Sequence, residues 1–270
     1  MMKKIFQFAL MVAAITMTAC VGKFTRTETI TEEADTLPWY ENMEALNADL
    51  KAAIDDAREL DSTKVGVNLM PIKKGTPNEE WETINGKNMV LLVTLVDSSR
   101  LQKFFGQEGV YKIDREMGTW VTIPGEWLTK KEAFEGLDSA AAHMRMLQMY
   151  GLSPDCTYNI MVQFYADVKG IFRPASDPSI DTTSAGIEFP EWADENYKVG
   201  DTNFREWFRY NVSAAFEDDS PLPWTRLGYT YDWHKGAPRQ GLSEYVVVDQ
   251  TYLKVKSHES EWQFIQNLSK

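Results

Sequence analysis

The sequence predicts an α+β fold, in which a mixed or antiparallel sheet packs with several helices in a single globular domain. Two observations support this class. Helix-like and strand-like patterns are mixed along the chain, and they show no regular βαβ alternation. The chain also contains 12% aromatic residues, including nine tryptophans, which is enough for a substantial core. We divide it into residues 1–19, residues 20–37 and a globular domain at 38–270.

The first half of the globular domain contains an expected helix followed by strands. Apolar residues recur every three or four positions between residues 43 and 60, which predicts an amphipathic helix. The expected strands are Val65–Met70, Met89–Val96 and Thr119–Ile123. The second of these runs is almost continuously apolar, so we expect a central strand that is buried on both faces.

The second half begins with a helix at Ser139–Tyr150. Asp138 can cap its start and Gly151 can end it in the left-handed conformation. We expect its methionines to pack in the core rather than to form a binding surface. The remaining expected elements are a strand at Tyr158–Tyr165, a helix at Phe204–Ala215 capped near Asp201, and a last helix capped by Ser257. Residues 173–200 show little periodicity, and a loop of this length is either functional or mobile.

The N-terminal segment carries the clearest functional signal. Lys3 and Lys4 precede an apolar stretch at residues 5–15, which is shorter than the roughly 20 residues that span a bilayer and suits a signal peptide. The following run MTAC, which ends in Cys20, resembles the lipobox of bacterial lipoproteins that signal peptidase II cleaves. The alternative is a conventional secreted protein in which Cys20 occurs by chance.

The resemblance implies cleavage before Cys20, with lipid on its sulfur and on the new amino group. Two or more acyl chains anchor a protein stably in a membrane. Val21 is not the aspartate that retains lipoproteins at the inner membrane in enterobacteria, so the resemblance favours the outer membrane and leaves its face open. Residues 1–19 are then the signal peptide, and residues 20–37, rich in threonine and glutamate, are a solvated tether.

Processing at Cys20 also changes the charge and the cysteine content. Loss of Lys3 and Lys4 leaves a net charge of −14, since the chain has 28 basic and 40 acidic residues. This charge argues against nucleic acid as a partner. Cys156 becomes the remaining cysteine, so no intramolecular disulfide can form. We interpret Cys156 as a small apolar residue buried at the start of a strand.

The densest group of unusual residues lies in an expected hairpin at 221–248. We predict that Trp233 lies opposite Leu242, because apolar residues then face one another along both strands. The same register places Arg226 opposite Asp249, which gives an opposite-charge pair across the strands.

This register puts Glu244 on the apolar face beside Tyr231. Burial there would raise the pKa of the Glu244 carboxyl and suit it to general acid or base chemistry. The sequence favours the alternative, in which Tyr231, His143 or the backbone satisfies the carboxylate. Asp232 and His234 could form an acid–base pair, but a turn-stabilising aspartate and an exposed histidine are favoured.

Three functions remain open. The first is a non-enzymatic accessory lipoprotein that binds a ligand, with carbohydrate as the leading class because flat aromatic rings suit sugar faces. Its candidate ligand-binding residues are Trp192, Trp224, Arg226, Tyr231 and Trp233. The second is a hydrolase or transferase with Glu244, Asp232 and His234 as catalytic residues. The third is a structural component of an envelope assembly that binds another protein.

Motifs for metals and nucleotide cofactors are absent from the sequence. The three histidines fall in separate predicted elements, and there is no His-Glu-x-x-His pattern or pair of cysteines. There is also no P-loop, dinucleotide fingerprint or Gly-x-Ser-x-Gly elbow. We therefore expect no metal and no cofactor, and the sequence favours a protein that is not an enzyme.

Overall fold

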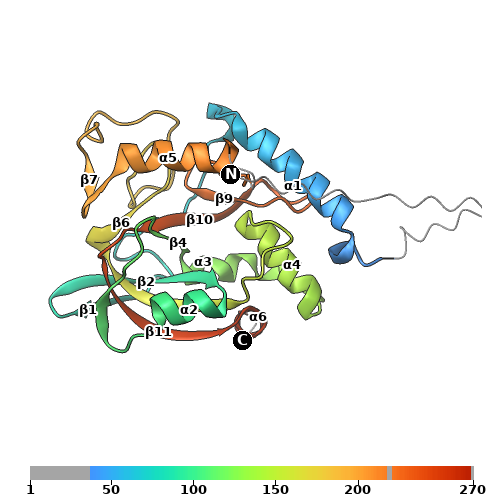
Figure 1. Ribbon diagram of the computed structural model, residues 1–270, viewed down its shortest axis with the longest axis horizontal. Helices are drawn as coiled ribbons and strands as arrows, with labels where there is room; N and C mark the ends of the chain where they lie inside the picture. The colour runs from blue at the N-terminus through green and yellow to red at the C-terminus, as the bar shows by residue number, and fades with distance from the viewer. Residues whose placement is uncertain (1–36, 218–220, 269–270) are drawn as a thin grey trace, which may run out of the picture. The chain divides into compact units, whose positions relative to one another are not determined.

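A computed structural model describes residues 37–217 and 221–268 of the chain. The predicted signal peptide at 1–19, Cys20 and the predicted tether as far as residue 36 lie outside the described residues. From Pro38 on, the described residues form one unit with an antiparallel sheet and packed helices (Figure 1). The predicted α+β class is confirmed.

Within the described residues, nine strands form the main sheet. They are β1 (Trp81–Ile84), β2 (Lys87–Val96), β3 (Val110–Lys112), β4 (Thr119–Thr122), β5 (Ile160–Asp167), β6 (Ile171–Phe172), β9 (Tyr229–Tyr231), β10 (Gln240–Val247) and β11 (Tyr252–Ser260). The order is β3-β11-β5-β2-β4-β10-β6, while β1 pairs with β2 and β9 pairs with β10. A separate small hairpin joins β7 (Lys198–Val199) to β8 (Thr202–Asn203).

Six α-helices pack against the sheet or against one another in the same part of the chain. They are α1 (Met43–Arg58), α2 (Ser98–Phe105), α3 (Pro124–Trp127), α4 (Ser139–Tyr150), α5 (Phe204–Glu217) and α6 (Glu261–Asn267). Short 3-10 turns lie at Trp39–Glu41, Ser62–Lys64, Leu128–Phe134 and Val168–Gly170. The predicted ends of α4 are confirmed, since Asp138 accepts from Ala141 N at 2.9 Å and Gly151 has φ of +71°.

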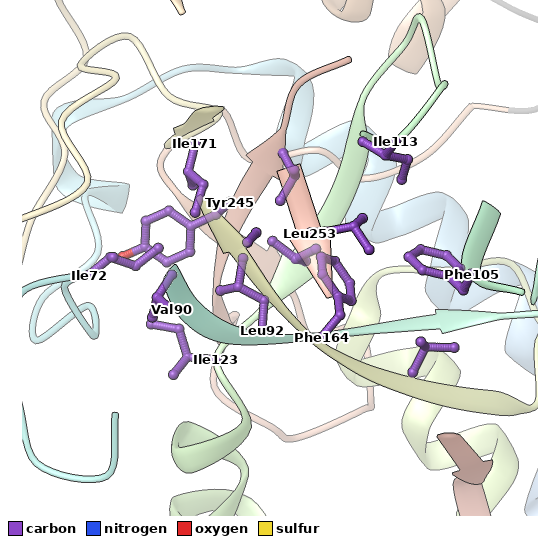
Figure 2. Close-up of a cluster of buried hydrophobic side chains, with 14 of the residues drawn as sticks. Ile72, Val90, Leu92, Phe105, Ile113, Ile123, Phe164, Ile171, Tyr245 and Leu253 are labelled. Carbon is purple, nitrogen blue, oxygen red and sulfur yellow. The ribbon is translucent and has the colours of Figure 1, made fainter. Parts of the chain in front are cut away.

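The two faces of the sheet bury different apolar clusters. On one face, side chains from β2, β5, β10 and β11 meet around Leu92, Phe164 and Leu253, and α2 contributes Phe105 (Figure 2). On the other face, α3, α4 and α6 cover one half of the sheet and α5 covers β6 and β10. Helix α1 packs against Met144 of α4 and Phe216 of α5, and so closes the second layer.

Strand β2 lies at the centre of the sheet, as predicted, and its neighbours hold it unequally. It pairs with β5 from Met89 to Val96, but its ladder with β4 has the single pair Val93 and Thr122. The Thr94 hydroxyl replaces the next ladder bond by donating to the Trp120 carbonyl at 2.9 Å. Beyond this point β2 and β4 separate, and the separation creates room between the two strands.

The prediction of a strand at Val65–Met70 is wrong. This segment is not regular, because its backbone is held by separate contacts rather than by a neighbouring strand. Leu69 N donates to Thr183 O at 2.8 Å, and Met70 N donates to the hydroxyl of Ser243 at 2.7 Å.

Two predicted helix caps are also displaced. Asn203, not Asp201, caps α5 by accepting from Glu206 N at 3.0 Å, because Asp201 lies in the turn between β7 and β8. Ser260, not Ser257, caps α6 by accepting from Gln263 N, because β11 continues to Ser260.

The long segment at 173–200 is organised by a buried arginine. Arg173 is 0% exposed, and its guanidinium donates to Thr182 O at 2.6 Å and to the Tyr245 hydroxyl at 2.9 Å. A charged group that is buried so completely requires such partners. The bond to Tyr245 therefore ties the loop to β10, the strand that also carries Glu244.

The predicted hairpin register is wrong. Tyr231 pairs with Gln240 and Tyr229 pairs with Ser243, so Trp233 does not face Leu242. The first strand is much shorter than predicted because Arg226 has φ of +59° and Gly228 has φ of +76°, and both bend the chain. A side chain at Gly228 would also meet Arg173, since its Cβ would lie 2.4 Å from Cδ.

Candidate ligand cavity

A cavity of about 420 Å³ opens where β2 and β4 separate. Its walls come from the ends of these strands, from β10, from α5 and from the chain at 222–224. The volume lies within the roughly 300–1,000 Å³ of small-molecule sites. The side chains that matter for its chemistry are Arg100, Arg115, Trp120, Tyr150, Trp224 and Glu244.

Glu244 reaches the cavity because it lies between two apolar clusters on one face of β10. Leu242 packs under α4 and α6, whereas Val246 packs under α5. The alternation of a strand puts Glu244 on the same face, at the seam between these helices. Across the ladder it lies opposite Thr122 of β4, at the point where β2 leaves β4.

The Glu244 carboxyl is buried without a protein partner. It is 6% exposed, and its Oε1 atom forms no hydrogen bond. The Nε1 atom of Trp224 lies near the carboxyl and opposes the rise in its pKa, but the geometry falls short of a hydrogen bond and leaves this donor unpaired as well. Burial dominates and raises the pKa of Glu244 to about 8, so the carboxyl is protonated at neutral pH.

The partners that the sequence favoured for Glu244 are engaged elsewhere. The Tyr231 hydroxyl donates to Asp56 at 3.0 Å, and His143 Nδ1 lies 2.9 Å from the carboxylate of Glu261. Glu244 is buried on the apolar face of β10, as predicted, but its predicted place across the strands from Tyr231 is wrong, because Tyr231 pairs with Gln240. The predicted satisfaction of its carboxylate by Tyr231 or His143 is also wrong.

Two arginines line another part of the cavity. Arg100 forms a salt bridge with Asp97, and its guanidinium lies over the Tyr158 ring at 4.6 Å from the centroid. Arg115 lies over Phe104 at 5.2 Å. No carboxylate in the described ranges 37–217 and 221–268 forms a salt bridge with Arg115, and burial lowers the pKa of its guanidinium.

The aromatic wall between these polar groups comes from two indoles. Trp120 of β4 and Trp224 meet edge to face, with ring centroids 5.6 Å apart. Trp120 also packs against Trp207 of α5 at 5.6 Å. The tryptophans are held by one another, so this wall is formed before any ligand arrives.

The proposed catalytic partners of Glu244 are not in the cavity. Asp232 is buried in a two-point salt bridge with Arg145, with bonds of 2.9 and 2.6 Å. It also accepts from His234 N at 3.1 Å, which matches the predicted turn-stabilising role. The His234 ring is half-buried against Trp39 instead of exposed, and burial lowers its pKa.

The predicted ligand-binding residues are dispersed. Trp224 and Tyr231 line the cavity. Trp233 is buried under α1, and its Nε1 donates to Leu152 O at 3.0 Å. Arg226 does not face Asp249 but donates to the carbonyl of Arg58 at 2.9 Å, and Trp192 is 52% exposed on the distant loop.

Sequence reasoning missed Arg100, Arg115, Trp120 and Tyr150 as cavity residues. Arg100, Trp120 and Tyr150 lie in or near elements that were predicted. A periodic pattern of apolar residues, however, cannot show where two neighbouring strands separate and leave a cavity. Trp120 was the residue that could best have indicated the site, because a tryptophan in a short strand must pack against other residues or bind a ligand to leave water.

Cys156 precedes β5 by four residues and packs half-buried against the α4–α6 cluster, so its predicted place at a strand start is wrong. Burial raises the pKa of its thiol.

Across residues 37–217 and 221–268, no three metal-binding side chains gather in one place. In the same ranges, no helix has the length and apolar character to cross a membrane.

Comparison with known proteins adds no assignment to these observations. No family model, curated protein or solved structure matches the chain.

Proposed function

We propose that the protein is a lipid-anchored envelope protein, held at the outer membrane through Cys20, that binds a small ligand in the cavity beside Glu244. The observation that carries the binding function is the pair of unpartnered buried groups at the cavity wall. Glu244 Oε1 and Trp224 Nε1 are buried without hydrogen bonds, and leaving such groups unpaired costs about 1–3 kcal/mol each. A ligand that bonds to both recovers this free energy.

The cavity supports binding better than catalysis. Glu244 lines the cavity, but its Oε1 atom is buried, and Asp232 and His234 are engaged elsewhere and cannot act with it. The hydroxyl of Tyr150, another cavity residue, lies 3.3 Å from the Thr122 hydroxyl. Burial raises the pKa of Tyr150 further above its usual value, so it stays protonated. A single protonated carboxyl beside the Trp224 indole can form hydrogen bonds to a ligand, and so it suits recognition.

The enclosed site also bears on the carbohydrate hypothesis. Trp224 is 7% exposed and Trp233 is 3% exposed, so neither offers a flat open ring to a sugar face. Trp192 is the exposed tryptophan of the candidate set, and its ring packs against Tyr197, with ring centroids 5.1 Å apart. We therefore place the ligand in the cavity rather than on an aromatic platform.

Filling the cavity should abolish binding. Ala214 of α5 lines the cavity, and the Ala214→Phe variant puts a ring into it. We expect this variant to weaken binding of the neutral probe 3-(4-hydroxyphenyl)propan-1-ol at least tenfold, as measured by calorimetry and by tryptophan fluorescence. Ser213→Phe is the matched control, because Ser213 is exposed on the same helix and does not line the cavity. Equal binding by the two variants would contradict the proposed site.

Lipid attachment is tested separately. The Cys20→Ala variant should move the protein from the membrane fraction to the soluble fraction, because two or more acyl chains are needed for a stable anchor. Cys156→Ala is the control and should stay with the membrane. A Cys20→Ala protein that remains in the membrane fraction would overturn the lipoprotein assignment, without affecting the cavity.

A further inference from the structure

The walls of the cavity carry an uneven distribution of charge. Glu244 is uncharged at neutral pH because burial raises its pKa to about 8, and the Trp224 indole is neutral. The cations at the wall are Arg100, which Asp97 neutralises, and Arg115, which has no salt bridge among the described residues. Arg115 is therefore the cation of this wall that lacks an ion pair among the described residues, in a protein whose net charge is −12.

The two polar parts of the site lie apart along the sheet. Arg115 N donates to the carboxylate of Asp249 at 2.6 Å, and Asp249 follows Glu244 by five residues. β10 ends at Val247 and Asp249 lies in the turn that follows, so the backbone of Arg115 lies beyond the end of the strand that carries Glu244. The Trp120, Trp224 and Tyr158 rings line the same cavity. An occupant that uses both parts is elongated and has an apolar or aromatic middle.

We infer that the ligand is an elongated aromatic monocarboxylate, whose carboxylate binds Arg115 and whose opposite end carries a hydrogen-bonding group for Glu244 and Trp224. This inference rests on the proposed function, because it assigns a ligand class to the same cavity. A carboxylate matches the planar fork of one guanidinium with two parallel hydrogen bonds. A phosphate dianion fits less well, since Asp97 and Asp249 lie next to the two arginines and would repel a second negative charge.

The first test uses the unmodified protein and a matched pair of probes. 3-(4-Hydroxyphenyl)propionate and 3-(4-hydroxyphenyl)propan-1-ol share a phenol and a chain length, and differ in the charge at one end. At pH 7 and low salt we expect calorimetry to give about tenfold tighter binding of the acid, the size of one charge-assisted hydrogen bond. Equal affinities would overturn the monocarboxylate inference while leaving the proposed binding function intact. If neither probe binds, both fail.

Variants then assign the two ends of the ligand. Arg115→Gln should remove the preference for the acid, because it weakens binding of the acid far more than binding of the alcohol. Arg209→Gln is the control, because Arg209 is exposed, is paired with Glu195 and does not line the cavity. Glu244→Leu should weaken both probes by a similar factor, since it removes the partner of the phenol. Retention of the preference in Arg115→Gln would overturn the assignment of the carboxylate to Arg115.

Discussion

The Asp232→Ala variant should lose about 3–5 kcal/mol of its free energy of unfolding, because it leaves the buried guanidinium of Arg145 without its counter-charge. Asp232 and Arg145 are 6% and 7% exposed in their side chains, and two hydrogen bonds join them. The pair connects α4 to the segment after β9, so its loss would also loosen the turn that Asp232 holds through His234 N.

Urea denaturation at pH 7 measures this effect, with the midpoint compared at constant slope. The double variant Arg145→Met with Asp232→Leu is the informative control, since apolar residues that replace a buried ion pair are often neutral or stabilising. We expect it to recover most of the loss. An Asp232→Ala protein as stable as the parent would contradict the structural role and reopen a chemical one for Asp232.

The Glu244→Gln variant should change how stability depends on pH. Because burial raises the pKa of Glu244 to about 8, the folded state favours the protonated form. The contribution of Glu244 to stability is therefore fully present below about pH 4.5 and is lost as pH rises through about 8. From the size of the pKa shift, the loss is about 3–5 kcal/mol. Glutamine cannot ionise, so the variant should be more stable than the parent at pH 9 and similar to it at pH 5.

Denaturation curves between pH 5 and pH 9 check this expectation. Glu126 contributes in the same direction, since burial raises its pKa to about 7 while Ser243 N and Oγ donate to it at 2.8 and 2.9 Å. The free energy of unfolding of Glu244→Gln should therefore still fall at high pH, but less steeply than that of the parent. A Glu126→Gln variant should remove part of the fall that remains. Parallel curves for the parent and Glu244→Gln would show that Glu244 ionises normally.

Local patterns in the sequence predicted the longer helices, the strands β2, β4 and β5, and one part of the site, but not α2 or β11. The continuous apolar run identified β2 as a central strand, and Asp138 and Gly151 marked the ends of α4. The position of Glu244 was also predictable, because Leu242 and Val246 on either side of it define the apolar face of β10. These features depend on residues that are close together in the chain.

The remainder depends on contacts between distant segments. The hairpin register could not be predicted because the positive φ of Arg226 shortens β9, and nothing in a period-2 pattern distinguishes a bent residue from an extended one. The separation of β2 from β4, whose ladder has a single pair, also could not be predicted from the sequence. Arg115 and Glu244 are 129 positions apart and meet at one cavity only in the folded chain.

A crystal structure of the protein grown with 3-(4-hydroxyphenyl)propionate tests the central claim most directly. We predict electron density for the probe in the cavity, with its phenol within hydrogen-bonding distance of Glu244 or Trp224, at about 2.7–3.2 Å, and its carboxylate at Arg115. A cavity filled by water at saturating probe concentration, or a probe bound elsewhere on the domain, would contradict it.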